Sequence, residues 1–267
     1  MKVLLMTGSH PRHRYVANQL ISAGLLHALL VEEREAMLPQ PPNDLHEQDR
    51  QNFIRHFQER EETEKAWFPD PSIDEEGHAL SVFRCRPETL NTEAVQNWVT
   101  EQQPDMVLTY GVHMLHAPLL AKLPPISWNI HGGLSPWYRG NTTLFWPFYF
   151  LKPNWAGMTI HQLTHKLDGG DIIHHSVPDL RYGDGIHDVA CRAVVQVVAD
   201  LIEIVQRIRS GHVISAIPQK SAGKLFTSAD WHPQHLRVIY NTFQNDMVDR
   251  FLDGELPVQQ PPLVKAF

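Results

Sequence analysis

The sequence predicts an α/β fold: a Rossmann-like, mostly parallel sheet flanked by helices. Short apolar runs recur at residues 2–7, 26–31 and 105–109, and each has the length of a buried strand. Stretches with apolar residues at helical spacing separate these runs. Alternating strands and helices are typical of a parallel sheet covered by helices.

The first strand–helix–strand unit lies at the N-terminus. Residues 2–7 lead into Gly8, residues 12–23 are helix-like, and residues 26–31 form the second apolar run. A doubly wound sheet begins in this way. The chain lacks a full Gly-x-Gly-x-x-Gly motif after the first run, so a dinucleotide cofactor is not indicated.

Residues 33–78 are predicted to be an excursion from this core. A proline-rich stretch at 39–42 interrupts the chain, and residues 44–67 are rich in charge and compatible with a helix. We interpret the second stretch as a solvated surface helix.

The α/β pattern then resumes. The expected strands are residues 79–83, 105–109, 127–130, 157–162 and 171–177, and the expected helices are residues 91–101, 116–122 and 185–209. Residues 1–211 are therefore predicted to be a catalytic domain. Residues 212–267 are predicted to be a C-terminal extension with a short helix near 235–252.

Composition narrows the class of protein. A net charge of -7 over 267 residues argues against a large nucleic-acid surface, which would need a basic face. The two cysteines, Cys85 and Cys191, belong to no paired motif, which fits a reducing compartment. The N-terminal apolar run is too short for a signal peptide or a membrane span, so we expect a cytoplasmic protein.

Residues 128–140 carry the strongest chemical signal. Asn129 and His131 are two apart at the end of an apolar strand, so their side chains point to the same side. Open α/β sheets bind ligands at this end of their strands. The Asn129 amide can donate to the oxyanion that forms when an amine attacks a formyl carbon, and His131 can manage the proton of that amine.

Asp168 can supply a carboxylate to this pair. It lies with Gly169 and Gly170 on an expected loop between two strands, where it would hold the imidazole and raise the pKa of His131. Taken alone, an Asp-Gly-Gly turn or an Asn-x-His strand end is more often structural.

Four motifs in one order resemble the formyltransferase family: Asn129-x-His131, Pro136-x-Tyr138-Arg139-Gly140, residues 157–161, and residues 167–173. That family includes glycinamide ribonucleotide, methionyl-tRNA and nucleotide-sugar N-formyltransferases. The resemblance covers roughly residues 1–209 and is strongest over residues 105–173. It implies a Rossmann-like core, formyltetrahydrofolate as co-substrate, and catalytic roles for Asn129, His131 and Asp168.

The resemblance also assigns binding residues. It implies a pterin pocket lined by Tyr110, Gly111, Val112, His113, Met114 and Leu115, with Gly169 and Gly170 nearby. We expect the acceptor at a polar loop that opens a helix, where an anion is favoured: Gly8, Ser9, His10 and Arg12. Trp137, Tyr138 and Arg139 could stack on or clamp the acceptor, although aromatic residues in such loops more often serve packing.

The identity of the amine that accepts the formyl group depends on features outside the catalytic residues. The family often has Pro-Ser after the catalytic histidine, whereas this chain has Gly132-Gly133, so acceptor contacts differ there. Methionyl-tRNA formyltransferases carry a larger basic C-terminal domain, whereas this chain is acidic. We therefore expect no nucleic-acid partner. Extra C-terminal elements are typical of the sugar enzymes. We therefore expect a small-molecule acceptor, an amine on a nucleotide-linked sugar, and a possible homodimer.

Four alternatives stay open. A formyltetrahydrofolate hydrolase or a glycinamide ribonucleotide formyltransferase would use the same three residues. A metal-dependent hydrolase is suggested by a dense group of His161, His165, Asp168, His174 and His175. Against it, no His-Glu-x-x-His motif occurs and neighbouring strand residues point to opposite sides, so no metal is expected. A non-catalytic protein with this fold would have no chemical reason to keep all three residue types.

Overall fold

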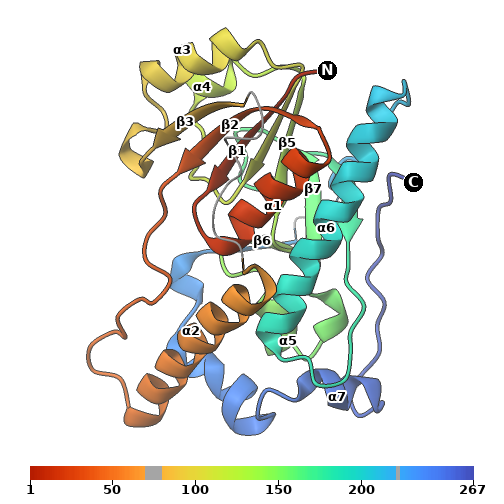
Figure 1. Cartoon of the computed structure of the whole chain (residues 1–267). Coiled ribbons are helices and arrows are strands. Elements are labelled where there is room, and N and C mark those ends of the chain that lie inside the picture. The colour runs from red at the N-terminus through yellow and green to blue at the C-terminus, as the bar shows by residue number, and fades with distance from the viewer. Residues whose placement is uncertain (70–79, 221–222) are drawn as a thin grey trace.

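The computed structural model describes residues 1–69, 80–220 and 223–267 (Figure 1). Its strands are β1 Val3–Gly8, β2 Leu26–Glu32, β3 Ser81–Cys85, β4 Met106–Tyr110, β5 Ile126–His131, β6 Tyr138–Gly140, β7 Met158–Gln162, β8 Ile172–Ser176 and β9 Lys224–Phe226. Its α-helices are α1 Pro11–Ser22, α2 Glu47–Trp67, α3 Glu93–Gln102, α4 Ala117–Leu120, α5 Trp146–Tyr149, α6 Ile186–Arg209 and α7 Met247–Leu252. Short 3₁₀ turns occur at Pro87–Thr89, Pro153–Trp155, Ser228–Asp230 and Pro233–His235, and a π-helical turn spans Val238–Thr242.

A seven-stranded sheet organises the molecule. Its strand order is β3-β2-β1-β4-β5-β7-β8. The five strands from β3 to β5 are parallel, whereas β7 runs antiparallel to both β5 and β8. The predicted α/β fold with a mostly parallel sheet is therefore confirmed.

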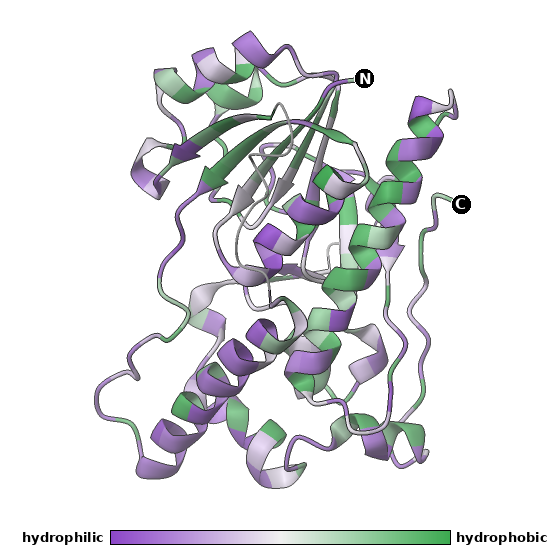
Figure 2. Ribbon diagram, viewed as in Figure 1, coloured by the Kyte–Doolittle hydropathy of each residue, from purple (hydrophilic) through white to green (hydrophobic). Residues whose placement is uncertain are grey.

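Helices cover both faces of the sheet (Figure 1). On one face, α1 and α6 pack their apolar side chains on β1, β4, β5 and β7, as Val16, Leu20, Val197 and Leu201 illustrate. On the other face, α3 and α4 bury Val95, Val99 and Leu119 against Leu4, Met6 and Val107. Strands β1 and β4 begin with uninterrupted hydrophobic residues, because both of their faces are buried. Figure 2 shows hydrophobic residues along the central strands and polar residues in parts of them.

The described elements follow the predicted ones closely. Every predicted strand and helix of the core is present with its ends shifted by a few residues, which is normal for such boundaries. The helix expected near residues 235–252 is instead divided into a π-helical turn and α7. Residues 70–79, which include part of the predicted excursion and the first residue of the strand expected at 79–83, lie outside the described residues.

The prediction that residues 44–67 form a solvated surface helix holds for one face only, where Gln51, Ile54 and Gln58 are exposed. Helix α2 is present, but it packs against α6 and the C-terminal region (Figure 1). Four of its polar side chains, Asp49, Asn52, His56 and Glu64, are buried on the packed face. Asp49 accepts two hydrogen bonds from Arg237, and His56 contacts the Tyr240 hydroxyl at 2.9 Å. Pairing of this kind removes the periodicity of apolar residues by which a packed helix is normally identified.

Residues after α6 return to the core at three places. Ile217 forms a bridge with Ile172 of β8, and β9 pairs in parallel with β6. The Val264 carbonyl oxygen accepts a hydrogen bond from the backbone N–H of His175. The division into residues 1–211 and 212–267 stays a prediction. Within the described residues, no helix has the length and apolar character needed to cross a membrane.

Candidate active site

Three neighbouring strands bring a row of polar side chains together. Asn129 of β5 lies opposite Thr109 of β4 and opposite His161 of β7. Residues paired across strands project from the same face of a sheet. His131, two residues along β5, therefore projects from this face as well, next to Asn129.

The Asn129 amide is fixed by three contacts. Its Oδ1 accepts a hydrogen bond of 2.7 Å from the Thr109 hydroxyl, which sets the orientation of the amide. Its Nδ2 then donates to His161 Nε2 at 3.2 Å and to Asp168 Oδ1 at 3.4 Å. The amide hydrogens thus point to His161 and to the carboxylate of Asp168.

Asp168 lies on the loop between β7 and β8, in a left-handed backbone conformation with φ of 47°. Its Oδ2 accepts a hydrogen bond of 2.8 Å from the Gly140 backbone N–H. Gln219 Nε2 donates to the carbonyl oxygens of Asp168 and Gly170 and so holds the loop from outside. His131, His161 and the Gly140 N–H stabilise the ionised form and lower the pKa of Asp168 to about 2, although its burial acts in the opposite direction.

His131 is buried beside this carboxylate. Its Nδ1 lies 3.4 Å from Asp168 Oδ2, and its Nε2 donates to the Tyr138 carbonyl oxygen at 2.8 Å. Burial lowers the pKa of His131, and the Asp168 carboxylate only partly offsets that effect. The expected rise in the pKa of His131 is therefore corrected, because loss of hydration outweighs the attraction of one carboxylate.

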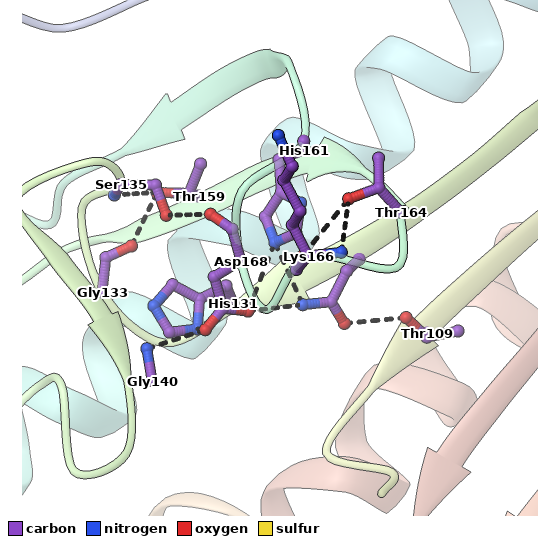
Figure 3. A network of polar contacts seen from close by, with 12 residues as sticks. Thr109, His131, Gly133, Ser135, Gly140, Thr159, His161, Thr164, Lys166 and Asp168 are labelled. Carbon is purple, nitrogen blue, oxygen red and sulfur yellow. Dashed lines mark hydrogen bonds and ion pairs between the residues drawn. The ribbon is translucent and has the colours of Figure 1, made fainter. Parts of the chain in front are cut away.

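The buried turn that follows His131 contacts the backbone of Asp168. Ser135 N donates to Thr159 Oγ1 at 2.9 Å, and Thr159 Oγ1 donates to the Gly133 carbonyl oxygen at 2.6 Å. Ser135 Oγ contacts the Asp168 carbonyl oxygen at 3.5 Å (Figure 3). Gly133 has no room for a side chain, since a Cβ there would lie 2.6 Å from the Tyr138 carbonyl oxygen.

A depression of about 470 Å³ lies beside the row of polar side chains. One wall comes from α4 and the residues that follow it, including Leu120 and Leu123. The other contains Ser127, two residues before Asn129, and the segment 162–165 that follows His161. An apolar wall faced by a few polar groups is typical of small-molecule sites.

One group of residues predicted to contact the acceptor lies at the start of α1. These residues contact other parts of the protein instead. The Arg12 guanidinium binds both carboxylate oxygens of Glu64 in α2, at 2.6 and 2.9 Å. Ser9 Oγ accepts from the Arg34 N–H, and His10 Nε2 donates to the Glu35 carbonyl oxygen. The His13 ring fills the space over Gly8, where a Cβ would lie 2.3 Å from its Nδ1.

The second group of predicted acceptor residues lies next to the carboxylate. Trp137 packs edge-on against Trp155, and Tyr138 is buried and stacks on Phe226 of β9. Arg139 is half-buried, with its guanidinium close to Gly169. The structure therefore gives Trp137 and Tyr138 packing contacts and places Arg139 at the Asp168 loop.

The residues predicted to bind the pterin differ in their exposure to solvent. Among residues 110–115, Tyr110 and Leu115 are buried, while His113 and Met114 are exposed. His113 contacts the buried Glu32 at 2.9 Å. The depression is instead lined by the residues directly after this stretch. Gly170 is sterically required, because a Cβ there would lie 1.8 Å from the Gln162 carbonyl oxygen.

Sequence reasoning gave no role in formyl transfer to Thr109, His161 or Gln219. Thr109 closes an apolar strand, and a polar residue at that end of a parallel strand is a usable signal. His161 was considered only as a metal ligand and as part of a family motif. Gln219 lies 51 residues from Asp168 along the chain, and no local pattern connects the two.

No group of three or more His, Cys, Asp or Glu side chains within the described parts of the chain is arranged to hold a metal ion.

Comparisons with known proteins fit this geometry. Glycinamide ribonucleotide transformylase 1 from Symbiobacterium toebii is 15% identical, with a TM-score of 0.54 over 82% of this chain and 94% of that one. A formyltransferase from Anoxybacillus kamchatkensis, solved with UDP-4,6-dideoxy-4-formamido-L-AltNAc and tetrahydrofolate, is 17% identical. Its TM-score is 0.50 over 92% of this chain and 96% of that one. At these identities the two structures share the fold.

Sequence comparison identifies the family. The bifunctional polymyxin resistance protein ArnA of Wigglesworthia glossinidia brevipalpis is 28% identical over 112 residues, which are 42% of this chain. The chain spans only 17% of that relative's length. The formyl transferase family model matches residues 45–222, which is more than half of the chain. The chain therefore belongs to the formyl transferase family of folate-dependent enzymes.

Proposed function

We propose that this enzyme transfers a formyl group from formyltetrahydrofolate to the primary amine of a nucleotide-linked amino sugar, with Asn129, His131 and Asp168 as its catalytic residues. The observation that carries the proposal is the position of the Asp168 carboxylate. It lies 3.4 Å from the Asn129 amide nitrogen and 3.4 Å from the His131 imidazole. An oxyanion donor, a base and a carboxylate that can stabilise the protonated base thus meet at one point.

The contacts of His131 favour a role as base. Because its Nε2 donates to the Tyr138 carbonyl oxygen, the neutral ring leaves Nδ1 unprotonated. The lowered pKa keeps the ring neutral near pH 7. Nδ1 can accept the proton of the attacking amine, directly or through one water. The imidazolium that results would then be stabilised by Asp168 Oδ2, which stays ionised.

Formyltetrahydrofolate supplies the activated formyl group in this reaction. As the amine nitrogen bonds to the formyl carbon, the formyl oxygen gains negative charge. Asn129 Nδ2 can donate to that oxygen in place of Asp168 Oδ1, which at 3.4 Å is the longer of its two contacts. The Thr109 hydroxyl keeps the amide in the orientation that presents Nδ2. Bond formation to the acceptor is followed by cleavage of the bond to the folate nitrogen, which takes up the proton.

The depression beside Asn129 suits a flat, partly polar ring. Leu120 and Leu123 can contact its face, and Ser127, Gln162 and Thr164 can contact its edge. We propose this depression as the pterin site. The proposal moves the pterin by a few residues from the predicted 110–115 stretch towards residues 117–127 and 162–165.

Two observations support a sugar nucleotide as the acceptor. The alignment with the formyltransferase solved with a UDP-linked formamido sugar covers a larger share of this chain than the alignment with the glycinamide ribonucleotide transformylase. Residues beyond α6 also contact the catalytic loop, through Gln219 and through β9. Such residues can form part of an acceptor wall in an enzyme that carries an extra C-terminal element.

The test is a panel of amines incubated with 10-formyltetrahydrofolate: UDP- and dTDP-linked 4-amino and 3-amino sugars, and glycinamide ribonucleotide. We expect an N-formyl product from at least one sugar nucleotide. Asn129→Ala, His131→Ala and Asp168→Ala should each abolish it while retaining the wild-type melting curve. Product from glycinamide ribonucleotide alone would overturn the acceptor class. Formate release without any amine would identify a hydrolase.

A further inference from the structure

His175 connects two segments that are far apart in sequence. It lies on β8 and is completely buried. Its Nε2 is 2.8 Å from the Ser135 carbonyl oxygen, and its Nδ1 is 2.9 Å from the Val264 backbone nitrogen. Residues 263–267, called the strap below, run beside β8 at this point, since Val264 contacts His175 and Ala266 contacts His174.

The strap determines which ring nitrogen carries the proton. A backbone N–H can only donate, so Nδ1 of His175 must accept from Val264. The neutral ring therefore has its hydrogen on Nε2, which is the form that donates to Ser135. The His175 N–H donates to the Val264 carbonyl oxygen, and Lys265 Nζ donates to the His175 carbonyl oxygen, both at 2.8 Å.

Ser135 in turn lies in the turn between His131 and the Asp168 backbone. Its N–H binds Thr159, and its hydroxyl contacts the Asp168 carbonyl oxygen. The His175 bond to its carbonyl oxygen is thus a third point of attachment. Each attachment comes from a different element: β7, the β7–β8 loop and β8.

We propose that His175 is a positioning residue for formyl transfer: with the strap, it holds Ser135 and thereby sets the position of Asp168 against Asn129 and His131. The inference rests on the proposed catalytic roles of those three residues. No role in catalysis follows from its burial alone, since most buried histidines are structural. The direct hydrogen bond to the catalytic turn is what separates it from them.

The neighbouring His174 provides a matched control. It is also buried, and its Nδ1 also accepts from the strap, from the Ala266 N–H at 3.0 Å. Its Nε2, however, points to the opposite side of β8 and donates to Asp200 of α6 at 3.2 Å. Loss of His174 should therefore loosen the strap without releasing the catalytic turn.

The first test measures amide hydrogen exchange and needs no substrate. We expect His175→Phe to speed exchange in residues 132–141 by roughly tenfold, because one buried hydrogen bond of the turn is lost. His175→Gln, whose amide can both donate and accept, should restore slow exchange. His174→Phe should speed exchange in residues 263–267 only. Equal exchange of residues 132–141 in His175→Phe and wild type would overturn the inference.

The second test separates positioning from binding. With the best acceptor of the panel above, His175→Phe should lower kcat by about tenfold to a hundredfold and leave KM for 10-formyltetrahydrofolate within about twofold. His174→Phe should keep both values near wild type. A His174→Phe enzyme that loses as much kcat at equal stability would overturn the inference. A wild type without any formyl-transfer activity would instead overturn the proposed function, and the exchange result would still stand.

A variant of the strap keeps the test informative if His175→Phe does not fold. Val264→Pro removes the N–H that sets the His175 tautomer, and Ala266→Pro removes the corresponding donor to His174. We expect faster exchange in residues 132–141 from the first change and not from the second. Identical behaviour of the two proline variants would contradict a specific role for His175.

Discussion

Asp168 and His131 show how burial and charge oppose each other at a single pair of residues. Both side chains are almost fully buried, which disfavours their charged forms. The carboxylate stays ionised because the Gly140 N–H, His131 and His161 surround it. The imidazole, with one carbonyl and one carboxylate as neighbours, has a lowered pKa. The pair therefore contains a permanent anion and a base that is free to take up a proton.

The first prediction concerns that anion. Asp168→Asn should lower kcat by about a hundredfold or more, because an amide cannot stabilise the imidazolium. The pKa of His131 should also fall further, since the carboxylate is the main group that raises it. Activity and a histidine NMR titration would check both effects. Asp171→Asn, on the same loop, is the control, and an Asp168→Asn enzyme with wild-type kcat would contradict the mechanism.

At the scale of elements, β6 and β9 fix the backbone beside the carboxylate. Gly140 of β6 has φ of 90°, and a Cβ there would lie 2.1 Å from the Phe226 carbonyl oxygen of β9. The same residue donates its N–H to Asp168. A segment that follows α6 in the chain thus constrains the residue that stabilises the anion.

The second prediction follows from this contact. Gly140→Ala should destabilise the fold by about 2–3 kcal/mol, through an unfavourable φ and a clash that must separate β6 from β9. Activity should fall as well, because the N–H bound to Asp168 moves. Gly183→Ala is the control: φ is 84° there, but no atom lies within 4 Å of its Cβ, so only the strain of about 1 kcal/mol should appear. Equal melting temperatures for the two variants would contradict the clash.

Helix α2 is attached to α1 through a buried carboxylate. Glu64 binds Arg12 of α1 and Arg60 of its own helix, at 2.6 and 3.0 Å, and only 6% of its side chain is exposed. Two arginines share one carboxylate, so removal of the negative charge leaves two like charges side by side.

The third prediction is therefore a large effect from one substitution in α2. Glu64→Gln should lower the free energy of unfolding by about 3 kcal/mol, because a buried pair is broken on one side only. Glu61→Gln, which loses an exposed pair with Lys65 on the same helix, should cost less than about 0.5 kcal/mol. Urea denaturation of both variants measures the difference. Similar midpoints would show that α2 is not held through Glu64.

The strands and helices also show which parts of the fold can be predicted from the sequence. Strands such as β1 and β4 were predictable because they are buried on both faces and therefore apolar without interruption. The packing of α2 was not, because Asp49, His56 and Glu64 are buried by pairing with residues up to 188 positions away. The pattern of such a helix is polar, and its partners are fixed only by the fold.

At the scale of the whole molecule, contacts between distant segments also limit how much of the candidate active site can be predicted from the sequence. Asn129, His131 and Asp168 lie on or next to strands whose ends the pattern locates, so their proximity could be expected. Gln219 and Gly140 reach Asp168, and the strap reaches His175, from segments that carry no periodic signal. Hydrogen bonds from backbone groups cannot be located from residue types alone.

Buried neutral histidines are distributed across the molecule. Burial lowers the pKa of His175 and His187 to about 4, and it also lowers the pKa of His13, His56 and His131. In an unfolded chain each would titrate near 6.5. Above that pH both states are neutral, and these groups give no pH dependence. Between about 6.5 and 4 the unfolded chain binds protons that the folded chain does not.

The fourth prediction is that stability falls as the pH decreases through this window. The free energy of unfolding should be flat from pH 8 to 7 and then decrease, with each such histidine adding a slope of up to about 1.4 kcal/mol per pH unit. Asp168 acts in a separate window: its pKa is lowered to about 2, so its contribution is lost only below about pH 4. Urea denaturation at pH 8, 7, 6 and 5 measures the slope. His175→Gln and His187→Gln should each reduce it by one histidine's share, and an equal free energy at pH 8 and pH 5 would show that these rings are hydrated in solution.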